Sequence, residues 1–160
     1  MAEAKEKNVW AKFGKIIPAP LPTNEDLISS IKKVCKDNGI RYGAILSTIG
    51  SLRQLTIEVV VRSKKSRTGQ DFGPPQVIPG PLQVLSLIGI IFETDKGEMD
   101  AHIHGTFVNI EGKIYGGHLI EGGCPVSTRL ATVIGEIADV SLIERLDPES
   151  GHLLLHVEPL

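Results

Sequence analysis

The chain has 160 residues and a formal charge of −2 at neutral pH, with 41% apolar and 22% charged residues. These values are ordinary for a single globular domain, and they exclude a protein with a large overall cationic excess for binding nucleic-acid phosphates. Aromatic residues make up only 4% of the chain, so Val, Ile and Leu must fill most of the core.

The N-terminal region is predicted to hold a tail and a first strand. Residues 1–8 have the composition of a solvated charged tail, and residues 9–160 are predicted to form one domain. Residues 9–17 favour a strand, which we expect to end at the prolines that follow it, Pro18, Pro20 and Pro22.

One principal helix is predicted after these prolines. Thr23 is the expected N-cap and Gly39 the expected stop, with Glu25 and Asp26 placed to favour the positive end of the helix. Apolar residues recur between them at helical spacing, as expected for one buried face. These residues are Leu27, Ile31, Val34 and Cys35.

The rest of the chain is predicted to consist of strands and turns. Residues 82–92 form a nearly continuous apolar run, which favours a central strand buried on both faces. Residues 63–80 are rich in proline and basic residues and are predicted to be a long loop, either mobile or functional. Short turns between strands favour antiparallel pairing. We therefore predict an α+β fold, a mainly antiparallel β-sheet with one principal helix packed on one face. The other predicted strands are 43–47, 54–62, 99–110, 114–120, 128–137, 141–145 and 153–157.

The same sequence predicts a cytoplasmic protein. The N-terminus lacks the apolar segment of a secretory signal, and no apolar run is long enough to cross a bilayer. Only two cysteines occur, so a disulfide framework is not expected. Cys35 is predicted to be a small core residue.

Three of the five histidines lie close together on two predicted strands. His102 and His104 are separated by one residue, so they point to the same face of their strand. His118 follows Gly116-Gly117 on the next strand. Three imidazoles on neighbouring strands are suited to a zinc, manganese or iron ion, and zinc is the expected one. His152 and His156 are predicted to be unrelated surface residues.

The metal interpretation requires a turn between these strands whose length places His118 on the same face as His102 and His104. A two-residue loop, Glu111-Gly112, would pair Gly105 with His118 and point His118 to the opposite face from His104. A three-residue loop, 110–112 or 111–113, places His118 on the histidine face, with Gly112 suited to a left-handed position. A bulge at Gly116-Gly117 is a further solution.

Three protein ligands would leave a coordination position open, as in catalytic zinc sites. Cys124, Glu121 and Asp100 are the nearest candidates in sequence for a fourth ligand or a general base. Imidazole must be neutral to bind metal, so zinc is expected to be lost below about pH 6. The sequence contains no convincing nucleophilic triad, phosphate loop or dinucleotide fingerprint.

Several spaced motifs resemble the PPC domain, the "plants and prokaryotes conserved" domain. They are 44–52 (AILSTIGSL), 85–89 (LSLIG), His102-Ile103-His104 and 116–119 (GGHL). The resemblance runs from about residue 16 to 137. It implies an antiparallel sheet flanked by a helix, a homotrimer, and metal ligation by the three histidines as in the stand-alone prokaryotic form.

The chain departs from that pattern in two places. It has no Arg-Gly-Arg-Pro AT-hook, the part that grips DNA in plant members. Arg129-Leu130-Ala131 stands where many relatives carry a Thr-Ala-Glu-like stretch, which puts an acidic role there in doubt.

Three functions remain open from the sequence. The favoured one is a trimeric metal-binding domain whose site is open to an unknown small-molecule ligand, with an enzymatic role as one form of it. The second is DNA binding, following the family's usual label, through the basic run 62–67. The third is a protein-interaction scaffold in which the metal only stabilises the sheet. No membrane partner is expected.

Overall fold

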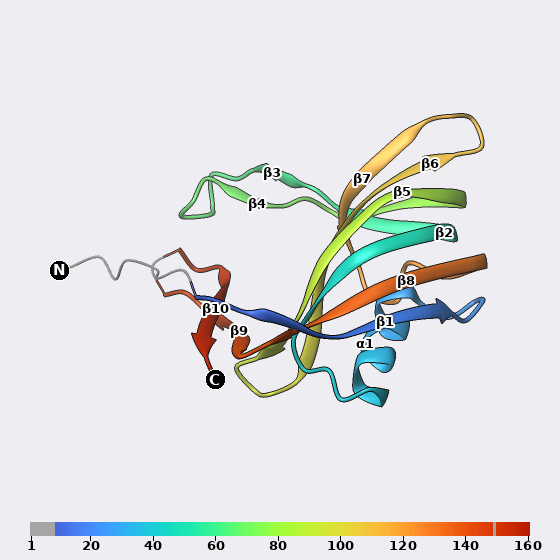
Figure 1. Cartoon of the computed structure of the whole chain (residues 1–160). Coiled ribbons are helices and arrows are strands. Elements are labelled where there is room, and N and C mark those ends of the chain that lie inside the picture. The colour runs from blue at the N-terminus through green and yellow to red at the C-terminus, as the bar shows by residue number, and fades with distance from the viewer. Residues whose placement is uncertain (1–8, 149) are drawn as a thin grey trace.

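The chain folds into a curved, mainly antiparallel β-sheet with one helix, as predicted (Figure 1). This computed structural model describes residues 9–148 and 150–160, so the predicted charged tail, residues 1–8, lies outside the described part. The elements are β1 (Lys12–Leu21), α1 (Leu27–Asp37), β2 (Gly43–Glu58), β3 (Val60–Arg62), β4 (Gln70–Phe72), β5 (Gln76–Thr94), β6 (Met99–Asn109), β7 (Ile114–Leu119), β8 (Val126–Ala138), β9 (Val140–Leu146) and β10 (Leu153–Pro159).

Eight of these strands form one sheet in the order β1-β8-β2-β7-β6-β5-β9-β10. Every neighbouring pair is antiparallel except β5 and β9, which run parallel. Strand β2 also pairs with β5, so β2, β5, β6 and β7 close into a ring. Along its first part β2 pairs with β8, and at Ile57 and Glu58 it pairs with β7 instead. This change of partner brings β7 into the ring.

Strand β1 is longer than predicted. It continues through Pro18 and Pro20 to Leu21, so the prediction that prolines end it at residue 17 is wrong. The strand lies at the edge of the sheet and pairs only with β8. Proline is tolerated at an edge because its missing N–H can face outward, where no neighbouring strand needs it.

The predicted helix is present, but its first turn has a different cap. The Asp26 carboxylate accepts hydrogen bonds from the N–H groups of Ile28 and Ser29, each at 3.0 Å, so Asp26 and not Thr23 is the N-cap. Gly39 ends the helix as predicted, with a φ of +68°. Leu27, Ile31 and Cys35 are fully buried, which confirms the apolar face. Helix α1 contacts β1 and β6.

Strand β2 runs without a break from the predicted strand 43–47 into the predicted strand 54–62. Between these two segments the pairing of β2 with β8 shifts, at Gly50 to Leu52. Gly50 has a φ of +141°, and a Cβ there would lie 2.3 Å from the carbonyl oxygen of Arg129. Only glycine fits this close approach of two strands.

The predicted loop 63–80 is a loop at residues 63–69 and 73–75, but residues 70–72 and 76–80 are in strands. Strands β3 and β4 pair with each other as a separate two-stranded hairpin, and β5 already begins at Gln76. The hairpin extends away from the main sheet (Figure 1). Strands of three residues are too short to leave a readable alternation of apolar and polar residues, which is why the sequence predicted a loop.

Strand β5 is central, as predicted, but it is not buried on both faces. Leu82, Leu87 and Ile91 belong to the core, whereas Leu85 and Ile88 are 52% and 62% exposed. Among the described residues no second layer covers these two side chains. None of the helices described is both long and apolar enough for a membrane span.

Candidate metal centre

The turn between β6 and β7 has the length that a three-histidine site requires. The N–H of Asn109 donates to the carbonyl oxygen of Lys113 at 3.0 Å, which leaves residues 110–112 as a three-residue loop. Gly112 occupies the left-handed position with a φ of +78°. In this register His104 lies directly across from His118, as one of the predicted three-residue loops requires. No bulge at Gly116-Gly117 is needed.

The three imidazole rings converge. His102 Nε2 and His104 Nε2 are 3.0 Å apart, and one ligand atom from each of the three histidines lies within 4.8 Å of the others. The His118 ring stands nearly perpendicular to the other two, with centroids 4.6 Å from His102 and 5.4 Å from His104. Nitrogens that share a tetrahedral zinc ion lie about 3.4 Å apart. The spacing therefore needs only small side-chain adjustments to hold such an ion.

The surroundings keep two of these rings neutral. Burial lowers the pKa of His118 to about 4, aided by His102 and His104 and opposed by Asp100. Burial also lowers the pKa of His102. His118 Nδ1 is buried, and no residue in the described part of the chain gives it a hydrogen-bond partner. This is a costly state for a polar atom, and a bound cation would relieve it. Neutral imidazoles with an unsatisfied buried nitrogen fit a borderline divalent ion such as zinc.

Phe72 on β4 packs against the histidine cluster. Its ring centroid lies 5.2 Å from that of His118, with the two planes at 41°. The β3–β4 hairpin therefore covers one side of the site. Sequence analysis did not identify Phe72, because it placed this residue in a loop.

Cys124, one predicted candidate for a fourth ligand, is not available for this role. Its side chain is fully buried, and the thiol donates to the carbonyl oxygen of Thr56 at 3.6 Å. Burial raises the pKa of Cys124 to about 11, so it remains a thiol at neutral pH. Only the thiolate is a good metal ligand.

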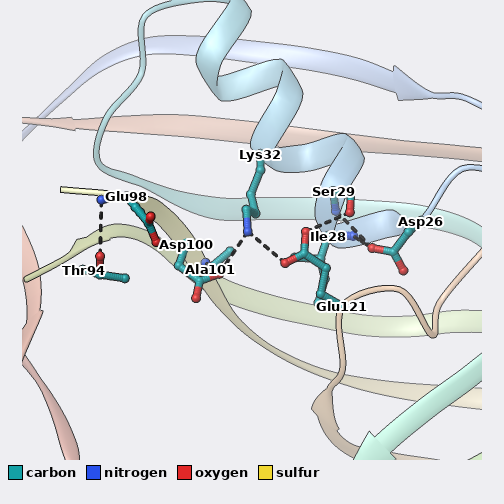
Figure 2. A network of polar contacts seen from close by, with 9 residues as sticks. All are labelled: Asp26, Ile28, Ser29, Lys32, Thr94, Glu98, Asp100, Ala101 and Glu121. Carbon is teal, nitrogen blue, oxygen red and sulfur yellow. Dashed lines mark hydrogen bonds and ion pairs between the residues drawn. The ribbon is translucent and has the colours of Figure 1, made fainter. Parts of the chain in front are cut away.

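Asp100 and Glu121, the other two candidates, are bound to a lysine (Figure 2). Lys32 on α1 reaches between them, with Nζ 3.3 Å from Asp100 Oδ1 and 2.8 Å from Glu121 Oε2. Glu121 also accepts a hydrogen bond from Ser29 Oγ at 2.8 Å. Burial alone would lower the pKa of Lys32, but the hydrogen bond that Lys32 donates to Glu121 and the two nearby negative charges raise it overall. These carboxylates attach the helix to the ends of β6 and β7.

A pocket of about 440 Å³ lies beside the histidines. Its polar lining includes His102, His104 and Glu144, a half-buried residue on β9 that the sequence analysis did not single out. Burial raises the pKa of Glu144, and the charge of Asp100 adds to this. The parallel pairing of β5 with β9 brings Glu144 to the site although it lies well beyond His118 in the sequence. The remaining lining is apolar: Ile45, Ile88, Gly89, Ile90, Phe92 and Leu155.

The other two histidines lie apart from this cluster, as predicted. His152 Nε2 shares a hydrogen bond of 2.8 Å with Thr68 Oγ1 on the turn between β3 and β4. His156 is exposed on β10. Neither contributes to the group of converging ligand atoms.

Comparison with solved structures finds the same architecture in other proteins. A metal-containing protein from Archaeoglobus fulgidus superposes with a TM-score of 0.78 at 25% identity, covering 93% of this chain and 98% of that one. A plant- and prokaryote-conserved (PPC) protein from Pyrococcus horikoshii superposes with a TM-score of 0.77 at 26% identity, covering 92% and 95% of the two chains.

Comparison with curated proteins finds a match inside a larger polypeptide. The chain is 27% identical over 146 residues to the bifunctional protein GlmU of a Synechococcus strain. The match covers 91% of this chain and 21% of that relative, so the chain spans about a fifth of the length of the curated proteins it matches.

The sequence profile of one family covers most of the domain. The Plants and Prokaryotes Conserved (PCC) domain matches residues 11–138, a span that contains all three converging histidines and ends with β8. The match agrees with the order of motifs in the sequence and with the solved structure from Pyrococcus horikoshii. The chain therefore belongs to the PCC domain family.

Proposed function

We propose that this chain binds one divalent metal ion, zinc, through His102, His104 and His118. The observation that carries the proposal is the convergence of three imidazole nitrogens from two paired strands. Three ligands leave at least one position open for a small-molecule ligand, and the adjacent pocket gives such a molecule a place to bind. A metal ion held this way supplies Lewis-acid chemistry and lowers the pKa of a bound water molecule.

Metal analysis of protein purified without nickel resin tests this proposal. We expect about one zinc per chain, retained through gel filtration and removed by a strong chelator. His104→Ala should lose the metal, whereas His156→Ala, which changes an exposed histidine outside the cluster, should keep it. The proposal is wrong if the unaltered chain lacks stoichiometric metal after reconstitution with zinc.

The proposal includes a homotrimer in the cytoplasm. In support of self-assembly, the internal strands β2 and β5 leave the apolar side chains Leu46, Ile49 and Leu85 between 43% and 72% exposed. Contiguous apolar surface of this kind usually contacts another protein. Sedimentation analysis tests the oligomeric state. In support of the location, Cys35 and Cys124 are both buried free thiols.

DNA binding is a second candidate function, favoured by the β3–β4 hairpin. The exposed basic side chains of Arg62, Lys64, Lys65 and Arg67 lie on an element that extends from the sheet (Figure 1). Two-stranded ribbons can enter a groove of DNA. Fluorescence anisotropy with duplex DNA at low salt tests this function. Binding should weaken steeply with added salt and be lost in Lys64→Ala/Lys65→Ala. Absence of binding at low salt would remove the candidate.

A further inference from the structure

The pocket next to the histidines has a mostly apolar lining and a few polar side chains. Ile45, Ile90, Phe92 and Leu155 form apolar walls contributed by three different strands, β2, β5 and β10. Its volume of about 440 Å³ lies within the range of small-molecule sites, which are commonly apolar with a few converging polar groups. The wall is continuous with the metal centre, because Ile90 pairs directly with His102 across β5 and β6.

Glu144 on β9 is the only acidic residue among those that line this pocket. Its carboxyl group forms no hydrogen bond or ion pair with any residue that the structure describes. The neighbouring Arg145 binds Glu158 at 2.8 Å and does not neutralise it. Glu144 also lies outside the group of ligand atoms within 4.8 Å of one another. A half-buried carboxylate without a partner, in a pocket that three converging histidines adjoin, is a candidate binding group.

These walls restrict the chemistry of the ligand. A simple inorganic anion would coordinate the metal, but it would leave the apolar walls in contact with water. It would also be repelled by the negative charge of Glu144. A purely apolar molecule would leave both the metal position and Glu144 without partners, which is costly for buried polar groups. A molecule that fills the pocket must therefore carry two groups at one end, its head. One is an oxygen atom that can coordinate the metal, and the other is an N–H or O–H group that can donate a hydrogen bond to Glu144.

We propose, resting on the zinc-binding function above, that the pocket binds an organic molecule with an apolar body and a bifunctional head. An oxygen atom of the head coordinates the metal held by His102, His104 and His118. An N–H or O–H of the same head donates to the Glu144 carboxylate. The apolar body lies against Ile90 and Leu155. The ligand is thus an amphiphilic small molecule in which an oxygen atom that coordinates the metal lies next to a hydrogen-bond donor.

Two hydroxamic acids that share one head and differ in their tail test the inference. Octanohydroxamic and acetohydroxamic acid both offer oxygen ligands and an N–H, but only the first has a long apolar tail. We expect the zinc-loaded protein to bind octanohydroxamic acid at least about tenfold more tightly by calorimetry, a gain that burial of two methylene groups can supply. Ile90→Asn should reduce this preference and leave binding of acetohydroxamic acid unchanged.

The role of Glu144 is tested with the same probes. Glu144→Met should weaken both acids by about tenfold or more, because each loses a hydrogen bond to a charged acceptor. Glu25→Met, at an exposed site before α1, is the matched control and should bind both acids like the unaltered protein. Zinc content measured in parallel should be unchanged in all variants.

Three results would overturn the inference. Absence of zinc in the unaltered protein would refute the metal-binding function and this inference with it. Full zinc occupancy with equal affinity for the two acids, or with Glu144→Met binding both normally, would refute the ligand class alone. Failure of octanohydroxamic acid to bind, together with dissociation of an oligomer by Ile90→Asn, would show that a second copy of the chain fills the pocket.

Discussion

His104 on β6 and His118 on β7 face each other directly across the antiparallel ladder, because the loop between their strands has three residues. His102 lies two residues before His104, with its Nε2 3.0 Å from that of His104. One hairpin thus brings all three rings together. The site depends on a local element of the chain and not on the assembly of distant segments.

Zinc should stabilise the fold only when this hairpin carries its three histidines. At a free zinc concentration one hundred times the dissociation constant, we expect the free energy of unfolding to rise by about 2.7 kcal/mol. His118→Ala should abolish this gain, whereas His156→Ala should retain it. Urea unfolding with zinc and with a chelator measures both. An equal gain in the His118 variant would place the metal elsewhere.

The stability of the metal-free protein should fall as the pH drops from about 6.5 toward 4. The pKa of His118 is about 4 in the folded chain, lowered mainly by burial, against an ordinary value near 6.5. Within this window the unfolded chain binds a proton that the folded chain does not, so acid favours unfolding. Because the pKa values of His118 and His102 are lowered, we expect any bound zinc to be released at a more acidic pH than about 6.

Comparison of pH 7.5 with pH 5.5 by urea unfolding in the presence of chelator tests this dependence. His118→Leu should make the free energy of unfolding less sensitive to pH over this range, and His156→Leu should leave its sensitivity unchanged. An identical pH dependence in the two variants would contradict the assignment to His118.

Lys32 should contribute more to stability than its neighbour Lys33. Lys32 is 18% exposed and bridges two carboxylates, whereas Lys33 is 74% exposed and pairs only with Asp37. Exposed ion pairs contribute between zero and about 1 kcal/mol. We expect Lys32→Met to cost about 1 kcal/mol in urea unfolding and Lys33→Met clearly less. Equal costs would show that the bridge to Asp100 and Glu121 is not stabilising.

Asp26 should be the critical residue at the start of the helix. Its carboxylate caps α1 through Ile28 and Ser29, and its second oxygen accepts a hydrogen bond from the Cys124 N–H at 3.0 Å. Loss of an N-cap alone costs about 1 kcal/mol. We therefore expect Asp26→Ala to cost about 2 kcal/mol by urea unfolding and Thr23→Ala much less. A larger effect at Thr23 would restore the cap predicted from the sequence.

The sequence contained the information for the histidine cluster because that information is local. Alternation at residues 102–104 places two rings on one face, and a glycine at 112 suits the three-residue loop that adds His118, but only the structure selects this loop over the two-residue alternative. The strand pattern and the helix were predictable for the same reason. Each depends on the periodicity of residues within about a dozen positions.

Features that depend on distant pairing were not predictable. Glu144 reaches the pocket only because β9 runs parallel to β5 at residues 93 and 94. No residue pattern near Glu144 in the sequence indicates that β9 pairs with β5. Likewise, Pro18 and Pro20 are compatible with a strand only once β1 is known to lie at the edge of the sheet. At these two prolines, the edge position of β1 in the sheet allows a strand, although the local sequence favours the end of one.

Strand β7 has hydrogen-bonded neighbours on both sides where it carries the site. His118 pairs with His104 of β6 and also with Glu58 of β2, and Leu119 pairs with Ile57. Fraying of this strand alone would have to break two ladders at once, so only large openings of the ring release it. Amide protons at these positions should therefore exchange with deuterium about as slowly as the most protected ones in the molecule, far behind those of the loop at residues 110–112.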